Sequence, residues 1–431
     1  MRISHHISAI KKKGSKEFFR KIRLLNILIL EITWFVIFLP FSICIVLMIR
    51  ILSPFLIIRL DLLRSWRIGH YADNPDLYLC ERKNGINHGS IRTLDVWFDG
   101  AKPCNFQLRI MLKRVINIYP RWLVKPVYIL NNLLPGANKH NIPKTACDNV
   151  DILNLIHNSC PSSHFEFTNE EEDRGKIELK KIGIGHKSKF VCLIVRDSAY
   201  LEQQKIENST GVDWNYNDFR DTEIQTYELA VNELVKNGYY VIRMGVKVNT
   251  KLSINHPMVI DYATNGMRTD FNDIYLGAKC EFCISTSTGY DSIPRLFRRP
   301  VVIVNQPHVE YFYSWLPDVV TIFQKVRDIN TGKYLPLKSI IDSGIGAYCR
   351  TNLFVEKGVE LIENTPEEIK DAVVEMILRT SGKWNDTWFD DEVRYQIESI
   401  YSESKLNGKI LSRFGTAFLK DNLYLLEDSC V

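Results

Sequence analysis

The sequence lacks the patterns that mark several large classes of protein. It contains no internal repeat and no low-complexity tract, and its 45% hydrophobic residues exclude a disordered chain. Its 24% charged residues are too many for a polytopic transporter. No GxGxxG motif follows a predicted strand, and the Ser/Thr-rich turn at residues 285–289 is not followed by the lysine of a Walker A loop. The usual dinucleotide fingerprint and the P-loop are therefore both absent.

Disulfide and zinc-finger patterns are also missing. The ten cysteines are scattered without a framework of close pairs, which favours a reducing compartment. Cys280 and Cys283 form a single CxxC, but no second pair and no nearby histidine completes a zinc site around them. We interpret both as small apolar packing residues, and we expect no metal site.

The positive charge is concentrated at the N-terminus. Over the whole chain 55 Lys and Arg face 50 Asp and Glu, a net charge of +5. Residues 1–67 hold twelve basic and three acidic residues, so they carry +9 and the remaining chain carries −4. A nucleic-acid-binding protein would place its basic patch on the folded domain, so the acidic globular part argues against that class.

Residues 32–49 form an apolar run without a charge, long enough with the residues before it to cross about 30 Å of hydrocarbon. Basic residues flank the run on both sides, which a buried core helix does not need, and the run is too long for a cleaved signal peptide. We therefore expect residues 1–63 to form a membrane-associated segment. Because Pro40 is expected to break the helix, the alternatives are a re-entrant pair of helices, a helix lying in the interface with residues 51–63 as an amphipathic continuation, and a simple span. The basic downstream flank favours the first two, which keep the folded part in the cytoplasm at the inner membrane.

The rest of the chain has the pattern of an α/β protein. From residue 189 onward, apolar runs typical of strands buried on both faces alternate with amphipathic helices, which predicts a doubly wound parallel sheet. The acidic run at 170–173 is interpreted as part of a solvated linker. The predicted organisation is an α/β domain over residues 64–185, a second α/β domain over 186–385 and a helical tail over 386–431.

Polar residues follow three of the predicted strands, at the ends where doubly wound sheets bind ligands. These candidate binding residues are Arg196, Asp197, Arg243, Ser285, Thr286, Ser287, Thr288 and Gly289. The turn at 285–289 offers hydroxyls, a permissive backbone and a helix N-terminus, which together can hold a phosphate without a metal. Arg196 would aim a fork of donors at the same edge, and Arg220, just before a helix, is a further candidate cation. The alternative is a turn rich in helix caps, with Arg196 in a salt bridge to Asp197 or another neighbour.

His70 and Asp73 are the candidate catalytic residues of the first domain. Gly69 allows a tight turn from which His70 would project, and a neutral imidazole can accept a proton near pH 7. Asp73 could orient the ring or act as the base itself. The alternative is a structural histidine with a satisfied hydrogen bond.

Six stretches carry a family resemblance. They are RIGHYADNPDLYLCE (67–81), VCLIVRDSAYL (191–201), FRDTEIQTYELAVNELVKNGYYVIRMG (219–245), IDYATNGMRTDFNDIYLGAKCEFCISTSTG (260–289), IPRLFRRPVVIVN (293–305) and IENTPEEI (362–369). They resemble glycosyltransferases encoded among bacterial surface-polysaccharide genes, which implies the GT-B fold with two Rossmann-like domains.

The order of the Arg-Asp motif and the Ser/Thr-rich turn is also similar to the nucleotide-sugar domain of fucosyltransferase-like enzymes. This similarity implies that Arg196 holds the diphosphate of the donor and that the turn at 285–289 lines the donor site. The chain lacks the histidine and the second arginine of that motif, so the resemblance does not extend to fucose as the sugar.

The function expected from the sequence is that of a metal-independent glycosyltransferase in cell-surface polysaccharide synthesis. No Asp-x-Asp stands at a strand end to hold a metal, and cations or helix dipoles would stabilise the leaving diphosphate instead. The expected partners are a nucleotide-sugar donor, a lipid-linked saccharide acceptor and the membrane, with no further cofactor and no nucleic acid. One rival is a GT-B-fold sugar-nucleotide epimerase, which would not need a membrane anchor. The other is a membrane-tethered assembly protein without catalysis.

Overall fold

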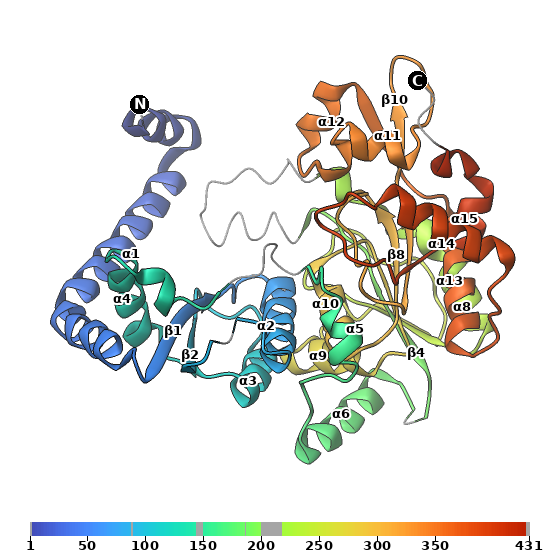
Figure 1. The fold of residues 1–431 in the computed structure, drawn as a ribbon. Helices are drawn as coiled ribbons and strands as arrows, with labels where there is room; N and C mark the ends of the chain where they lie inside the picture. The colour runs from blue at the N-terminus through green and yellow to red at the C-terminus, as the bar shows by residue number, and fades with distance from the viewer. Residues whose placement is uncertain (1, 88, 144–149, 186, 200–217, 428–431) are drawn as a thin grey trace.

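The computed structural model describes residues 2–87, 89–143, 150–185, 187–199 and 218–427. Two parallel sheets organise the chain (Figure 1). The helices and strands of the N-terminal part are α1 (Arg2–Leu52), β1 (Leu56–Leu63), α2 (Ile68–Lys83), β2 (Arg92–Asp99), α3 (Phe106–Val115), β3 (Ile118–Tyr119), α4 (Arg121–Asn132), η1 (Ala137–His140), α5 (Leu155–Ser159) and α6 (Asn169–Ile182). Those of the C-terminal part are β4 (Phe190–Ile194), η3 (Ile224–Tyr227), α8 (Glu228–Lys236), β5 (Tyr240–Arg243), β6 (Val259–Ile260), α9 (Asp270–Lys279), β7 (Cys283–Ser285), η4 (Gly289–Asp291), α10 (Ser292–Leu296), β8 (Val301–Gln306), β9 (Val319–Phe323), β10 (Lys325–Asp328), α11 (Leu337–Asp342), η5 (Ile345–Ala347), α12 (Thr351–Lys357), β11 (Val359–Ile362), α13 (Pro366–Thr380), α14 (Trp388–Ile400), β12 (Arg413–Phe414), α15 (Thr416–Asp421) and η6 (Leu423–Leu426).

The first sheet has three parallel strands in the order β1-β2-β3. Strand β1 pairs with β2 along its whole length, and Arg59 donates two hydrogen bonds of 2.6 Å to Asp95 across the pair. Both side chains are nearly buried, so each charge compensates the other inside the sheet. The expectation that residues 51–63 continue as an amphipathic membrane stretch is therefore wrong. The first sheet begins within that range, ahead of the predicted boundary at 64.

Helix α1 runs unbroken through Pro40, so the expected break and the re-entrant pair of helices are also wrong. The proline removes one backbone hydrogen bond from the helix. The ring of Phe38 packs edge-on against Trp122 of α4, with 5.5 Å between the ring centroids, and this packing supports the helix beside the proline. Val46 and Ile49 are buried in an apolar cluster with side chains of the first sheet and α4. The C-terminal third of α1 is thus part of the first domain.

The segment Lys21–Leu52 of α1 is long and apolar enough to cross a membrane, and it contains an 18-residue stretch with a mean hydropathy of 2.7. Glu31, a charge within this segment, pairs with Arg121 and Lys125 of α4 at 2.9 and 3.0 Å. Helix α4 therefore lies alongside α1, at the left of the molecule in Figure 1.

The acidic run at 170–173 is not a linker, because it forms the first turn of α6. Thr168 and Glu171 form a capping box there, and Glu171 also pairs with Arg114 of α3 at 2.6 Å. Glu172 pairs with Lys279 of α9 at 2.6 Å, so α6 contacts both domains. The negative charges stabilise the helix N-terminus as well as these contacts.

The second sheet has seven strands, all parallel, in the order β12-β9-β8-β7-β4-β5-β6. Successive residues of β4 alternate between two apolar clusters, one facing α8 and α13 and the other facing α9. The continuous apolar runs in the sequence reflect this burial on both faces, so the predicted doubly wound sheet is confirmed.

Four local details complete the second domain. The chain at 224–227 is a 3₁₀ turn before α8, and Thr222 forms a hydrogen bond with the Tyr227 hydroxyl. Thr269 caps α9, and Thr365 and Glu368 form a capping box on α13. The expected helical tail also contributes strand β12, which adds to the sheet edge next to β9.

Candidate functional site

The candidate site lies at the carboxyl edge of the seven-stranded sheet, between β4 and β7. The strand order reverses at these two strands, and such a switch point opens a ligand crevice in doubly wound sheets. Arg196 follows β4, Thr286 follows β7, and the Arg196 N–H donates to Thr286 Oγ1 at 3.1 Å. The structure thus brings together the two groups of polar residues that the sequence placed at these strand ends.

Two arginines lie at this switch point, and we call the region around Arg196, Arg220 and the turn at 285–289 the crevice. Arg196 Nε lies 3.1 Å from Asp221 Oδ1, and the Arg220 guanidinium donates to the backbone carbonyl of Ser287 in the turn. Burial, together with the positive charge of Arg196, lowers the pKa of Arg220 to about 10. Two like charges in one region are costly, and the Asp221 carboxylate offsets part of that cost through its ion pair with Arg196. Asp221, rather than Asp197, is the salt-bridge partner of Arg196.

Three buried polar atoms at the crevice have no hydrogen-bond partner among the residues that the structure describes. They are Arg220 Nε, Thr288 Oγ1 and His308 Nδ1. Burial, followed by the charges of Arg220 and Arg196, lowers the pKa of His308 to about 3, so this imidazole is neutral at pH 7 and lies within the field of both arginines. These three atoms are therefore available for hydrogen bonds to a polar ligand.

A buried network fixes the turn at 285–289. The carboxylate of Asp291 is fully buried and accepts hydrogen bonds from Ser285 Oγ at 2.8 Å, Tyr313 OH at 3.0 Å and the Arg295 guanidinium at 3.2 Å. Ser287 has a φ of 57°, a conformation that costs energy for a residue with a side chain. The network holds the turn in this shape and uses the Ser285 hydroxyl to do so.

Asp197 and Arg243 both have local partners. Asp197 accepts from the backbone N–H groups of Ala199 and Asn249 at 3.0 and 2.9 Å, which ties the loop after β4 to the loop after β5. Arg243 is buried and pairs with Asp261 at 3.3 Å. The direct contact of either residue with a ligand stays a prediction.

His70 lies in the first turn of α2, which begins at Ile68, and not on a tight turn. Gly69 serves a different purpose, because a Cβ built on it would lie 3.2 Å from Gly289 Cα and 3.3 Å from Ser292 Oγ. The half-buried His70 therefore follows directly the residue at which the first domain touches the turn at 285–289. Its role as general base stays a prediction.

Asp73 joins the two domains. Its Oδ2 accepts from Ser292 Oγ at 2.8 Å and from the Arg295 guanidinium at 3.0 Å. Burial raises the pKa of Asp73, although the charge of Arg295 acts in the opposite direction. Since Arg295 also contacts Asp291, one chain of contacts runs from α2 to the turn that borders the crevice. This geometry gives Asp73 a positioning task, and its action as a base stays a prediction.

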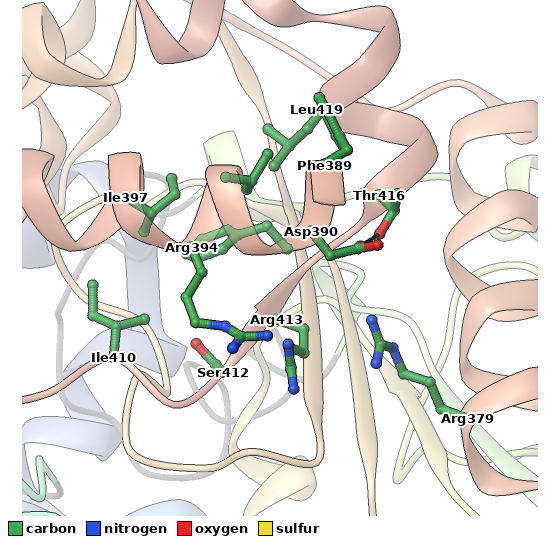
Figure 2. Close-up of a pocket in the computed structure, with 12 residues that line it drawn as sticks. Arg379, Phe389, Asp390, Arg394, Ile397, Ile410, Ser412, Arg413, Thr416 and Leu419 are labelled. Carbon is green, nitrogen blue, oxygen red and sulfur yellow. Dashed lines mark hydrogen bonds between the residues drawn. The ribbon is translucent and has the colours of Figure 1, made fainter. Parts of the chain in front are cut away.

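Figure 2 shows a pocket that lies elsewhere, at the edge of the same sheet formed by β12. Arg379, Arg394 and Arg413 gather there from α13, α14 and β12, and all three pair with Asp386 at 3.1–3.4 Å. Arg413 is opposite Val320, near the start of β9, so the pocket is at the amino end of the strands. These arginines have a carboxylate partner and lie away from the switch point, so we assign the pocket no ligand.

Two further residues of the site, His308 and Asp291, were not predicted from the sequence. His308 comes two residues after β8, so the strand-end rule that selected Arg196 would have found it. Asp291 lies inside a short helical turn, and its function depends on contacts with Tyr313 and Arg295, which no sequence pattern shows.

Comparisons with known proteins give structural but not sequence matches. No family model matches the sequence, and no curated protein is similar to it. The structure is similar to E. coli ADP-heptose LPS heptosyltransferase II, with 11% identity, a TM-score of 0.44, and coverage of 75% of this chain and 100% of that one. It is similar to a glycosyltransferase of family 9 from Veillonella parvula, with 10% identity, a TM-score of 0.42, and coverage of 74% and 97%. A third similar structure, from Listeria monocytogenes, is assigned by inference as a UDP-N-acetylglucosamine 2-epimerase, with 8% identity, a TM-score of 0.30, and coverage of 83% and 99%. The solved structures that this chain resembles thus include glycosyltransferases of family 9 and heptosyltransferases.

Proposed function

We propose that this chain is a glycosyltransferase that moves a sugar from a nucleotide-sugar donor to a saccharide acceptor. The observation that carries the proposal is the presence of Arg196 and Arg220 at the switch point, beside buried polar atoms that have no hydrogen-bond partner among the described residues. A nucleoside diphosphate presents several charged oxygens to such a site, and guanidinium groups bind them strongly. The sequence resemblance described above supports the same donor class.

The reaction would proceed at the junction of the two domains. An acceptor hydroxyl attacks the anomeric carbon of the donor sugar, the bond from that carbon to the diphosphate oxygen breaks, and the base takes the hydroxyl proton. His70 is our candidate for the base, with Asp73 as the alternative. Arg196 and Arg220 stabilise the negative charge that develops on the leaving diphosphate.

We propose that the transfer itself does not need a metal ion. Two guanidinium groups at the crevice supply positive charge where a metal would otherwise be required. Added Mg²⁺ or Mn²⁺ should therefore leave turnover unchanged. A strict requirement for either ion would contradict this part of the proposal.

The proposed setting is the cytoplasmic face of the inner membrane, with a lipid-linked saccharide as acceptor in cell-surface polysaccharide synthesis. Helix α1 exposes many large apolar side chains, yet Glu31 in its middle pairs with two basic residues of α4. An ion pair with a domain helix disfavours a simple span through hydrocarbon, because both elements would have to enter the bilayer. We therefore favour a helix lying in the membrane interface, with the first domain next to it.

A donor screen tests the proposal. The full chain, purified in detergent, is offered a panel of nucleotide-sugars, and binding and slow donor hydrolysis are measured. Binding of at least one nucleotide-sugar, with loss of binding in Arg220→Ala, is the expected result. Transfer to lipid extracts would then identify the acceptor class. Conversion of the donor to its epimer without transfer would favour an epimerase, and absence of all nucleotide-sugar binding would favour a non-catalytic assembly protein.

A further inference from the structure

A second cluster of reactive side chains lies outside the crevice. Cys80, Cys160 and His164 each place a ligand atom within 4.8 Å of the others. Cys80 is on α2, whereas Cys160 ends α5 and His164 follows it with three residues between them. Cys80 lies two helical turns beyond Asp73, about 10 Å along the helix, so the cluster is separate from the proposed site of transfer.

The side chains have the chemistry of a zinc site. Two thiolates and one imidazole are ligands that Zn²⁺ prefers, and three protein ligands leave a fourth position for water. Both cysteines are buried, with exposures of 0% and 2%, whereas the His164 side chain is 22% exposed, so water can reach the cluster from that side. Neither cysteine is in a disulfide.

The surroundings resemble those of known metal-binding histidines. Asp76 Oδ1 lies 2.9 Å from Nδ1 of His164, which leaves the other ring nitrogen available to a metal. A carboxylate behind a ligating imidazole is the usual second contact in zinc proteins, because it fixes the tautomer and the ring orientation. Asp76 is held in turn by Arg298 at 2.7 Å, and Arg298 Nε donates to the Cys160 carbonyl.

The charges also balance. Two thiolates compensate a divalent cation, and Asp76 is compensated by Arg298. The cluster therefore accepts Zn²⁺ without leaving a net buried charge.

We propose that Cys80, Cys160 and His164 bind a zinc ion that fastens the chain at 160–164, which follows α5, to α2. The backbone of this stretch already contacts the second domain, because the Cys160 carbonyl accepts a hydrogen bond from Arg298 Nε. The zinc would hold these two segments together and would take no part in the proposed transfer reaction, and the two thiol protons leave to solvent when it binds.

The first test measures metal in the full chain. After purification without chelators, metal analysis should find about one zinc per chain. The variants Cys80→Ser and Cys160→Ser should lose it, whereas Cys104→Ser and Cys349→Ser, which alter cysteines outside the cluster, should retain it. Equal zinc content in all four variants would overturn the proposal.

A second test needs no variant. Reduced, metal-free protein is titrated with Co²⁺, and thiolate–cobalt charge-transfer absorption should saturate at about one ion per chain. Absence of the band would overturn the proposal. A Cys80–Cys160 disulfide in freshly purified protein would do the same.

Discussion

Gly69 of α2 and Gly289 of the turn after β7 meet backbone to backbone. A Cβ built on Gly69 would lie 3.2 Å from Gly289 Cα, and one built on Gly289 would lie 3.3 Å from Gly69 N. The two residues are 220 positions apart in the sequence. Their contact is where the candidate catalytic helix of the first domain reaches the candidate donor site of the second.

Gly69→Ala tests this contact. The added methyl group would be closer than ordinary van der Waals distance to the turn, and we expect a cost of about 1–3 kcal/mol, offset in part by about 1 kcal/mol of helix propensity. Because the turn that borders the crevice must shift, we expect a larger relative loss of turnover than of the free energy of unfolding. Gly89→Ala is the control, since nothing lies within 4 Å of a Cβ at that exposed glycine. Parental turnover in Gly69→Ala would show that the close contact is unimportant.

Arg196→Ala and Arg220→Ala should each weaken donor binding by roughly tenfold to a hundredfold, the effect of losing about 1.5–3 kcal/mol of charge-assisted bonding. Calorimetry with the donor identified in the screen measures this. Arg394→Ala makes the same change in the pocket of Figure 2 and should leave donor affinity unchanged. Parental affinity in both crevice variants would mean that the arginines are purely structural.

His70→Ala should lower turnover by about a hundredfold or more, the usual size of a general-base effect, with little change in donor affinity. Asp73→Asn should be measured beside it. Because Asp73 bonds to Ser292 and Arg295, we expect that variant to lower thermal stability as well as turnover. Near-parental turnover in His70→Ala together with an inactive Asp73→Asn would transfer the role of base to Asp73.

His308 should make stability depend on pH. Its pKa is lowered to about 3 in the folded chain, below the ordinary value of 6.5, so the unfolded chain binds a proton first as the pH falls. The free energy of unfolding should therefore decrease below pH 6.5, by about 1.4 kcal/mol for each pH unit from this group.

In His308→Asn that contribution disappears. The free energy of unfolding of the parent minus that of the variant should be about 2 kcal/mol smaller at pH 5 than at pH 7.5. Chemical denaturation at both pH values measures it, with His157→Asn, an exposed histidine, as the control. A difference that stays constant with pH would contradict the low pKa of His308.

Truncation tests the new boundary of the first domain. A chain beginning at Ser65 would lose β1 together with the buried Val46 and Ile49, so we expect aggregation. A chain beginning at Glu31 keeps these elements and the contacts of α1 with α4, and we expect it to remain folded in detergent. Size-exclusion chromatography and circular dichroism measure both. A monodisperse, folded chain beginning at Ser65 would restore the boundary predicted at 64.

Short-range patterns in the amino-acid sequence predicted many of the helices and strands of the second domain. The apolar runs of β4 and β8 specify their strands through neighbours in the sequence, and the structure confirms them. Alternation of strand and helix also predicted the parallel sheet. In the first domain, the sequence pattern gave a wrong prediction for β1. Its sequence LIIRLDLL resembles an amphipathic stretch, and only the structure shows that Asp95 of β2 compensates the charge of Arg59.

The sequence alone also determined that Arg196 and the turn at 285–289 stand at strand ends, because each follows an apolar run directly. Only the tertiary structure decided what these residues face. The order of the sheet places β4 next to β7, so that the Arg196 N–H meets Thr286 Oγ1, and the fold brings Arg220 to the same turn through its hydrogen bond to the Ser287 carbonyl. The contact of Gly69 with Gly289 and the gathering of Cys80 with Cys160 depend on chain segments that pack far from their sequence neighbours. Spacing along the chain carries no signal for such contacts, because packing of whole helices and strands brings the residues together.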